Sequence, residues 1–408
     1  MSRKKIKILI VAFSDSVHTA RWISQLDHSK YEVHLFPSVP FRQIHPLVQN
    51  VTVWQLPHDK DDEDKGLFFK NPSIIYKSIE KLTGKSLVRK FAGRIKPWLR
   101  LSLQKTIELL RPEIIHSMES QNSGYLVNSL KFDNSKPFWI HSNWGIDIHY
   151  FGLFPYHQGQ LKKLMSGVGI LIVEGERDLQ LARELGFRKN ITIIPSVGGS
   201  PDFQLYDRLD SGIPASARKK IILKGYEGQE RLASVALKAL RSIRILLADY
   251  EVIVYSCNRK LLPLIEEIQS KKEFTLKVSV ELTYQEILEM TAQSRLSITN
   301  NLSDGVPNTM LEAMAFGTFP VQSNTAITEE WIEDGVNGLL TVPTDESSIA
   351  AAISRALSDD NLVDKASMIN RKLVREKLNM DIIRKQIDRV YGTTILNVPD
   401  LLPLPNGI

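Results

Sequence analysis

Cysteine is almost absent from this chain of 408 residues, which contains only Cys257. A single cysteine cannot form an intrachain disulfide, and such scarcity favours a reducing compartment. No cysteines and histidines recur with the spacing of a structural zinc site, so the sequence predicts no bound metal. The fingerprint Gly-x-Gly-x-x-Gly follows none of the predicted strands, which argues against a nicotinamide or flavin dehydrogenase.

Long hydrophobic runs are missing as well. Basic N-terminal residues precede the apolar run Ile6–Phe13, but this run is too short for a signal peptide and stops at Ser14. We interpret it as a buried strand. No later segment approaches the roughly 18 consecutive apolar residues of a membrane span. The sequence therefore predicts a cytoplasmic protein that is soluble or peripherally attached to the inner face of a membrane.

Length and composition predict two hydrophobic cores. A chain of 408 residues with 43% hydrophobic content is long for one core and sufficient for two. The formal net charge of +6 and the pI near 9.1 suit an anionic membrane, an acidic substrate or nucleic acid equally well. Charge alone therefore does not identify a partner.

Short apolar runs alternate with helical patterns, which predicts an α/β protein with parallel sheets. The strands expected in the first half are Ile6–Ala12, Glu32–Phe36, Val51–Leu56, Ile114–Ser117, Phe138–His141, Gly169–Val173 and Ile191–Pro195. Those in the second half are Ile221–Lys224, Glu251–Ser256, Thr275–Val278, Leu296–Asn300, Phe319–Gln322 and Leu339–Val342. The helices expected there are Gln229–Leu247, Tyr284–Gln293 after the capping box Thr283-x-x-Glu286, Glu346–Leu357 and Asp381–Tyr391.

These elements predict two doubly wound domains. Residues 1–200 would form an N-terminal Rossmann-like domain, and residues 219–380 a C-terminal Rossmann-like domain. Glycines and prolines near 198–201 and 212–214 favour a linker over residues 201–218. Residues 381–408 would form a final helix and tail that return to the N-terminal domain.

The segment Ser303–Gly317 is the most informative stretch of the sequence. Asp304 and Glu312 stand at i and i+8, in a loop that opens into a short helix. We expect Asn308 or Thr309 to cap that helix and Gly317 to end it in a left-handed conformation. The free amides and dipole of a helix start can bind a diphosphate, and a carboxylate one turn further can accept hydrogen bonds from a ribose diol. A sugar nucleotide carries both groups.

A structural alternative explains the same spacing. Thr309-x-x-Glu312 also fits a capping box, in which the glutamate only closes back onto its own helix start.

The whole stretch 303–340 resembles the donor-site signature of family 4 glycosyltransferases. The matching features are the two carboxylates eight residues apart, the helix start Leu311-Glu312-Ala313-Met314-Ala315 and the turn Gly335-Val336-Asn337-Gly338-Leu339-Leu340. Members of this family are retaining, nucleotide-sugar-dependent enzymes of the GT-B fold, in which two Rossmann-like domains face each other across a cleft. The first carboxylate of the signature is usually Glu, and the shorter Asp304 stands in its place.

The resemblance implies roles for individual residues. Glu312 would bind the ribose hydroxyls and Asp304 the donor sugar, and both count with His141 as candidate catalytic residues. Where the family has a Gly-Arg pair and a later lysine, this chain has Gly225, Tyr226 and Arg231. Arg231 and the helix start would bind the diphosphate. The remaining candidate donor-binding residues are Lys224, Ser303, Gly305, Asn308, Thr309 and Leu311.

Alternatives stay open for several of these residues. Lys224 and Arg231 also fit solvated positions at a strand end and a helix start. His141 ends a predicted strand in the first domain, where family members often carry an active-site histidine, but a histidine there is commonly a structural hydrogen-bonding residue. The candidate acceptor-side residues, for which a cap or core position is the alternative, are Ser16, His18, Arg21, His116 and Asp147.

The segment Lys81–Arg111 is rich in basic residues that are interleaved with aromatic and aliphatic ones. Such a helix can lie on an anionic bilayer, which suits an enzyme with a lipid-linked acceptor. The alternative is an ordinary helix of the first domain, with its apolar stripe in the core and its lysines in water.

The resemblance implies a transfer of a sugar from a nucleotide diphosphate sugar to an acceptor hydroxyl, in polysaccharide or glycolipid biosynthesis. The scheme needs no cofactor or metal and no nucleic-acid partner. Its partners would be the donor, a glycan or lipid-linked glycan acceptor, and an anionic membrane. Two other classes are compatible with the sequence: a sugar-nucleotide epimerase on the same fold, and a non-catalytic binding protein with a degenerate site.

Overall fold

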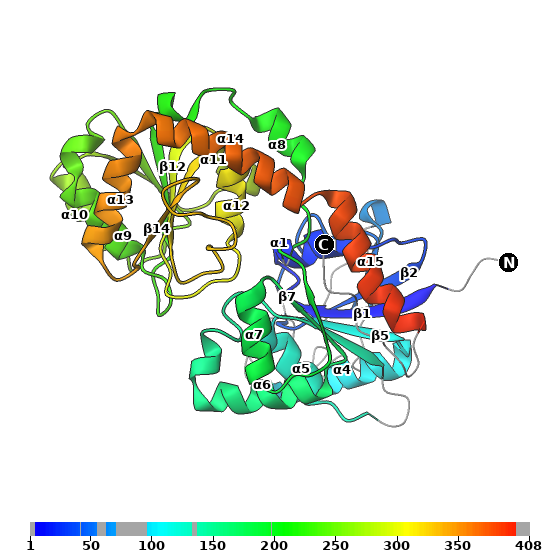
Figure 1. Cartoon of the computed structure of the whole chain (residues 1–408). Coiled ribbons are helices and arrows are strands. Elements are labelled where there is room, and N and C mark those ends of the chain that lie inside the picture. Colours follow the sequence, from blue (N-terminus) through cyan, green and yellow to red (C-terminus); the bar gives the residue numbers. More distant parts are fainter. Residues whose placement is uncertain are drawn as a thin grey trace, which may run out of the picture. The chain divides into compact units, whose positions relative to one another are not determined.

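The computed structural model describes residues 5–40, 42–54, 63–70, 96–132, 137–196 and 198–396. The chain divides into two compact units. Unit 1 comprises Met1–Pro201 and Met380–Ile408, and unit 2 comprises Asp202–Asn379. Each unit is an open parallel sheet with helices on both faces (Figure 1).

Unit 1 contains an eight-stranded sheet in the order β4-β3-β2-β1-β5-β6-β7-β8. All its strand pairs are parallel. The strands are β1 (Ile6–Ala12), β2 (Tyr31–Pro37), β3 (Val51–Trp54), β4 (Leu67–Lys70), β5 (Ile114–Met118), β6 (Phe138–Ser142), β7 (Ile170–Val173) and β8 (Asn190–Ile193). The sequence predicted seven of these and missed β4, because Leu-Phe-Phe-Lys is too short to show an alternating pattern.

Helices cover both faces of the first sheet. Ile8 and Ile10 of β1 point into a core shared with α1 (Val17–Ser24) and α15 (Met380–Leu396). Leu9 and Val11 point into the opposite core. The helices that line this second face are α4 (Lys96–Leu110), α5 (Tyr125–Asn128), α6 (Pro155–Gly167) and α7 (Glu176–Glu184). Short helical turns complete the unit at η1 (Glu63–Lys65), η2 (Ser120–Gly124) and η3 (Phe151–Leu153).

The C-terminal helix α15 is joined to the first sheet by a buried hydrogen-bonded chain. The Tyr391 hydroxyl accepts a hydrogen bond of 2.9 Å from Trp22 Nε1 and lies 2.6 Å from His116 Nδ1. Since the indole can only donate, the hydroxyl proton goes to His116 Nδ1, and His116 Nε2 donates to Ser142 Oγ at 2.7 Å. Residues from the end of the described chain thus complete the core around β1 and β5.

Unit 2 contains a six-stranded parallel sheet in the order β11-β10-β9-β12-β13-β14. Its strands are β9 (Lys220–Lys224), β10 (Glu251–Tyr255), β11 (Thr275–Ser279), β12 (Ser294–Thr299), β13 (Phe319–Ser323) and β14 (Leu339–Thr341). Its helices are α8 (Phe203–Leu209), α9 (Ala233–Ser242), α10 (Leu262–Ser270), α11 (Tyr284–Ala292), α12 (Asn308–Ala315), α13 (Glu346–Ser358) and α14 (Asp360–Lys377), with turns η4 (Ala215–Ala217) and η5 (Arg244–Leu247). All six predicted strands of this half are confirmed.

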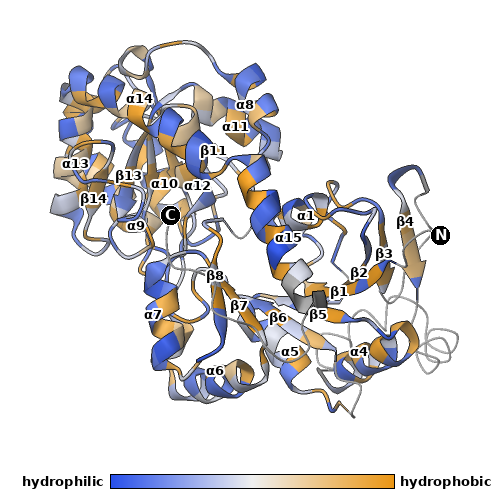
Figure 2. Cartoon of the chain, turned by 45° about the vertical axis from the view of Figure 1, so that its right-hand side comes forward, coloured by the Kyte–Doolittle hydropathy of each residue, from blue (hydrophilic) through white to orange (hydrophobic). Residues whose placement is uncertain are grey.

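Hydrophobic residues concentrate on the strands and on the inner faces of the helices in both units (Figure 2). In β9, Ile221 and Leu223 pack under α9 and α13, whereas Ile222 packs on the other face beside α11. The alternation follows from the two-residue period of a strand.

Two predictions in unit 2 are corrected by the structure. The expected helix Gln229–Leu247 is shorter, because Glu227–Leu232 pairs with itself and with Asn301 in short antiparallel bridges before α9 begins. The expected linker 201–218 folds into unit 2 after Pro201: Asp202 caps α8, and Asp210 pairs with Arg371 of α14. Glycine and proline mark turns, but they do not show whether a turn packs against a core.

Among the described residues, none of the helices combines the length and the hydrophobicity that crossing a bilayer requires.

Candidate donor site

The loops that carry the predicted donor residues lie at the topological switch point of unit 2. From β9 the chain proceeds outward through β10 and β11, and it later returns to β12 on the other side of β9. The loops after β9 and β12 therefore diverge at their carboxyl ends, where open α/β sheets bind ligands. Backbone hydrogen bonds nevertheless connect the two loops, from Leu232 N to Asn300 O at 3.0 Å and from Leu302 N to Glu230 O at 2.8 Å.

Glu312 lies in the first half of α12 and is 6% exposed. Its Oε1 accepts a hydrogen bond of 2.8 Å from the Tyr284 hydroxyl at the start of α11. The Tyr284 oxygen is in turn 3.0 Å from the hydroxyl of Tyr206 in α8. Because the Tyr284 proton points to the carboxylate, Tyr206 donates to Tyr284. Two tyrosines that sequence reasoning missed thus fix the orientation of the Glu312 carboxylate, which is the group predicted to bind the ribose.

Tyr255, at the end of β10, is a further neighbour of Glu312. It is fully buried, and burial raises the pKa of its hydroxyl, with the nearby Glu312 charge adding to the rise. Tyr255 therefore stays neutral beside the carboxylate. No sequence motif marked Tyr206, Tyr255 or Tyr284, although Tyr284 is the residue directly after Thr283 in the confirmed capping box Thr283-x-x-Glu286.

The start of α12 differs from the prediction. Pro307 is the N-cap, and no side chain caps the helix, so Asn308 and Thr309 belong to its first turn. The capping-box alternative, in which Thr309 and Glu312 close the helix start, is therefore wrong. Proline ends the preceding loop in an extended conformation but offers no side-chain acceptor, and the helix start keeps its dipole without a capping side chain.

Gly317 ends α12 as expected, with φ +67°. An added Cβ would lie 1.9 Å from Ser367 Oγ of α14, so only glycine fits.

Asp304 lies in the loop after β12 and is held by its own loop. Its carboxylate accepts from Asn301 Nδ2 at 3.0 Å and from Gly305 N at 3.0 Å. Ser303 and Gly305 are buried beside it. Leu311 is buried too, but its side chain packs in the core with Met310 and Met314, and its amide donates to Pro307 O at 3.1 Å. Helix and core thus use both the side chain and the amide of Leu311, and its predicted role in donor binding stays a prediction.

The two candidate cations come together on Tyr226. The Lys224 ammonium lies 4.7 Å from the ring centre of Tyr226, and the Arg231 guanidinium lies 5.1 Å from it. Arg231 also pairs with Glu230 at 3.2 Å. The aromatic residue that replaces the family's arginine therefore gathers two positive charges instead of supplying one.

Gly225 connects these groups to the sheet. Its amide donates to Tyr255 O at 2.8 Å, and an added Cβ would lie 2.6 Å from Val254 Cγ1. The loop after β9 can approach β10 this closely only because residue 225 has no side chain.

Comparison with known proteins identifies the family that unit 2 matches and the fold of the chain. Residues 224–373, which lie within unit 2, match the family model described as glycosyl transferases, group 1. Unit 2 is therefore similar to the glycosyltransferase domain of this family, and the chain has the GT-B fold. No curated protein matches it.

Solved structures show the GT-B fold across nearly the whole chain. Sucrose-phosphate synthase from Thermosynechococcus elongatus aligns with a TM-score of 0.71 at 13% identity, covering 96% of this chain and 100% of that one. Anabaena HepE in complex with UDP-glucose aligns with a TM-score of 0.67 at 13% identity, covering 95% and 100%. A glycosyltransferase from Rickettsia africae aligns with a TM-score of 0.65 at 12% identity, covering 97% and 100%.

Unit 1 has its own switch point, between β1 and β5. Two acceptor-side candidates lie after β1: Ser16 caps α1 by accepting from His18 N at 3.2 Å, and the His18 ring packs edge-on against Trp144 at 5.1 Å. Arg21 is 8% exposed and lies on α1. Ser16 therefore has the capping role named as its alternative, while His18 lies next to the loop after β6.

His116 and His141 are core residues in the structure. Both are fully buried, and burial lowers the pKa of each imidazole to about 3. His141 Nδ1 donates to Ser117 O at 3.0 Å, and Nε2 accepts from Ser120 Oγ at 3.0 Å. With both ring nitrogens engaged, these two neutral histidines fit the structural alternative, and their catalytic and acceptor-side assignments stay predictions.

Asp147 belongs to a buried carboxylate pair at the carboxyl edge of the first sheet. It accepts from Ser120 N at 2.7 Å and from Trp144 N at 2.9 Å. Burial and the charge of Glu119 hold the pKa of Asp147 well above its usual range. Glu119 adopts φ +77° and accepts from the amides of Gln121 and Asn122 at 2.7 and 2.9 Å. This pair orders the loops after β5 and β6, and Glu119 was not predicted.

Within the described ranges, no cluster of three or more histidine, cysteine, aspartate or glutamate side chains is positioned to hold a metal ion. The first part of the basic segment, residues 81–95, lies outside the described residues. Its remainder, from Lys96 to Arg111, forms α4 and the residue after it.

Proposed function

We propose that the transferase moves a sugar from a nucleotide diphosphate sugar to an acceptor hydroxyl, with retention of anomeric configuration. The observation that carries the proposal is the buried carboxylate of Glu312, which accepts a hydrogen bond from Tyr284. Glu312 lies in the first half of α12, a helix that has no side-chain cap and begins at the switch point of unit 2. Retention of configuration follows from the resemblance to family 4.

The donor would be bound by three groups. Glu312 would accept hydrogen bonds from the ribose hydroxyls, and Asp304 would contact the donor sugar directly or through water. The start of α12 with Arg231 and Lys224 would bind the diphosphate, whose negative charge grows as the glycosidic bond breaks. Fixed cations and amides there stabilise the transition state more than the ground state. Anabaena HepE, a similar structure, is described in complex with UDP-glucose, which supports a donor of this class.

The acceptor would be a growing glycan or a lipid-linked precursor, and the reaction would belong to polysaccharide or glycolipid biosynthesis. The donor scheme uses side chains and amides of this chain, so we propose no cofactor and no metal for it. Membrane contact through Lys81–Arg111 stays a hypothesis from the sequence.

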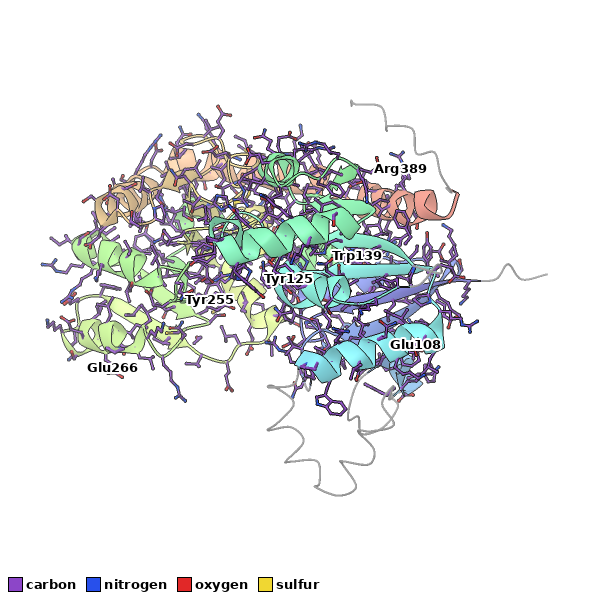
Figure 3. All side chains as sticks on the ribbon, turned by 90° about the horizontal axis from the view of Figure 1, so that it is seen from below. Glu108, Tyr125, Trp139, Tyr255, Glu266 and Arg389 are labelled. Atoms are coloured by element: carbon purple, nitrogen blue, oxygen red, sulfur yellow. The ribbon has the colours of Figure 1, made fainter. Side chains whose placement is uncertain are left out.

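Titration calorimetry of the full chain against a panel of nucleotide diphosphate sugars tests the donor assignment. We expect one donor to bind and Glu312→Ala to abolish that binding, because the ribose loses its buried acceptor. Glu266→Ala is the matched control, since Glu266 is an exposed carboxylate on α10 of the same unit (Figure 3). Unchanged affinity in Glu312→Ala would reject the assignment.

Product analysis separates the transferase from its rivals. A transferase releases the nucleoside diphosphate, either by slow donor hydrolysis or faster with an acceptor. An epimerase would convert the sugar nucleotide without acceptor and without releasing the diphosphate. A binding-only protein would show affinity but no turnover.

A further inference from the structure

A segment of unit 1 exposes several large apolar side chains side by side. It runs from Tyr150 to His157, between β6 and α6, and we call it the aromatic loop. Leu153 is 72% exposed, Tyr156 67% and Phe154 43%. Exposed apolar residues scattered singly are normal, but a contiguous group marks an interaction surface.

The aromatic loop is ordered by its own contacts. The His157 ring lies 4.7 Å from that of Phe151 and 5.2 Å from that of Tyr156, and its Nδ1 is 3.1 Å from the Tyr125 hydroxyl. Backbone hydrogen bonds from Leu153 N to Tyr150 O at 3.1 Å and from Phe154 N to Phe151 O at 3.0 Å close the turn. The apolar side chains are therefore presented on a fixed backbone, so binding through them costs little conformational entropy.

The sequence around the aromatic loop is basic. No aspartate or glutamate occurs between Asp147, which is buried, and Glu174. Lys162 and Lys163 are exposed on α6, the helix that begins within the loop.

Helix α4 extends this character across the same layer of unit 1. It lies with α5 and α6 on one face of the first sheet. Figure 3 labels Glu108 of α4 and Tyr125 of α5. Leu101 and Leu109 of α4 are 55% and 58% exposed, with the exposed cation Arg100 beside them, while Lys105 pairs with Glu108 at 3.2 Å.

We propose that the aromatic loop, with Lys162 and Lys163, is a surface that binds an anionic lipid bilayer. An aliphatic tip flanked by tyrosine rings and followed by lysines is the pattern of an interfacial anchor, in which apolar groups enter the headgroup boundary and cations contact lipid phosphates. A twofold contact with a second copy would bring the lysines of both copies together.

The surface also suits the reaction. The aromatic loop follows β6 and lies at the carboxyl edge of the first sheet, the edge that carries the loops with Ser16 and Asp147. Anchoring this edge would bring it close to a lipid-linked acceptor; this last step rests on the proposed function, whereas lipid binding itself does not.

Flotation of the full chain with phosphatidylcholine vesicles, with and without phosphatidylglycerol, tests the proposal. We expect flotation only with the anionic vesicles. The variant Leu153→Ser/Phe154→Ser/Tyr156→Ser should lower the partition coefficient at least about tenfold, because the apolar groups that enter the interface are gone. Lys162→Gln/Lys163→Gln should lower it about thirtyfold, by roughly 1 kcal/mol for each lysine, and the effect should shrink at high salt.

Ile245→Ser is the matched control, since Ile245 is 84% exposed but lies in unit 2. Melting temperature and nucleotide-sugar affinity, measured on the same variants, should stay unchanged, because all the substituted side chains are at the surface. Absence of flotation for the unmodified chain, or unchanged flotation of the triple variant, overturns the proposal. Absence of nucleotide-sugar binding by the unmodified chain would reject the proposed function but would not affect the proposal of lipid binding.

Discussion

At the residue scale, the Tyr284 hydroxyl explains how a single carboxylate can be set for a ribose. A buried glutamate with rotamer freedom would pay entropy to bind a diol, and the hydrogen bonds of Tyr284 and, behind it, Tyr206 remove that freedom in advance. All three residues belong to unit 2, so the site can be prepared within one unit.

Replacing Tyr284 with phenylalanine should weaken nucleotide-sugar binding about tenfold, because a hydrogen bond to a charged group contributes roughly 1.5–3 kcal/mol. Calorimetry with the donor identified above measures the effect. Tyr206→Phe is the control: Tyr206 reaches Glu312 only through Tyr284, so we expect a smaller loss. Equal affinities for all three proteins would show that the tyrosines only pack.

The sequence predicted Glu312, Asp304 and the Lys224–Arg231 pair because each stands at a fixed offset from a strand end or a helix start. It could not predict Tyr206, Tyr255 or Tyr284, since their approach to Glu312 depends on how α8, α11 and β10 pack around α12. For His116 and His141 the sequence left the structural alternative open. A position near a strand end brought them into the candidate list, but the burial of both rings follows from neighbours that are remote in sequence.

At the scale of elements, strands were predicted more accurately than helix starts. Short apolar runs flanked by turns have few alternative interpretations, and the predicted strand ends lie within one or two residues of the observed ones in most cases. Helix starts depend on local pairing that a pattern does not show, as the delayed start of α9 and the Pro307 cap of α12 demonstrate.

Helix α12 should depend on Gly317 for its stability. Alanine at this position would have to adopt φ +67° and place its Cβ 1.9 Å from Ser367 Oγ. We expect Gly317→Ala to lower the free energy of unfolding by about 2 kcal/mol or more, since the left-handed region alone costs an L-residue roughly 1–2 kcal/mol. Chemical denaturation of the full chain measures the loss.

Measuring the effect of Gly317→Ala in a Ser367→Ala variant provides the control. In that variant the hydroxyl that an added Cβ would meet is gone, so Gly317→Ala should cost less there than in the unmodified chain. Additive effects of the two substitutions would show that Ser367 does not oppose the added methyl group.

At the scale of the whole molecule, the histidines are distributed unevenly. All nine lie between His18 and His157, and unit 2 has none. Burial lowers the pKa of the following seven in the described part of unit 1: His28, His34, His45, His116, His141, His149 and His157. The two units should therefore respond differently to acid.

Acidification from pH 7 to pH 5 should destabilise unit 1 selectively. An unfolded histidine takes up its proton near pH 6.5, whereas folded His116 and His141 do so only near pH 3. Their contribution to stability is thus full above pH 6.5 and is lost as the pH falls, by up to about 1.4 kcal/mol per pH unit for each. Glu119 and Asp147, whose pKa values are raised by burial, act in the opposite direction and offset part of the loss.

Hydrogen exchange followed by mass spectrometry at the two pH values resolves this prediction by unit. Peptides from β1, β5 and β6 should lose protection at pH 5 before those from β9, β10 and β12. Earlier loss in the strands of unit 2 would contradict the assignment of acid sensitivity to the buried histidines.

The position of α15 also has a consequence for biosynthesis. Ile383, Ile387, Val390 and Tyr391 fill the core of unit 1, yet the ribosome makes them only after all of unit 2 has been translated. Unit 2 is one continuous segment, so it can complete its fold while the N-terminal strands still wait with part of their hydrophobic surface uncovered. A released chain truncated before Met380 would accordingly carry a complete unit 2 and a unit 1 whose core lacks the apolar side chains of α15.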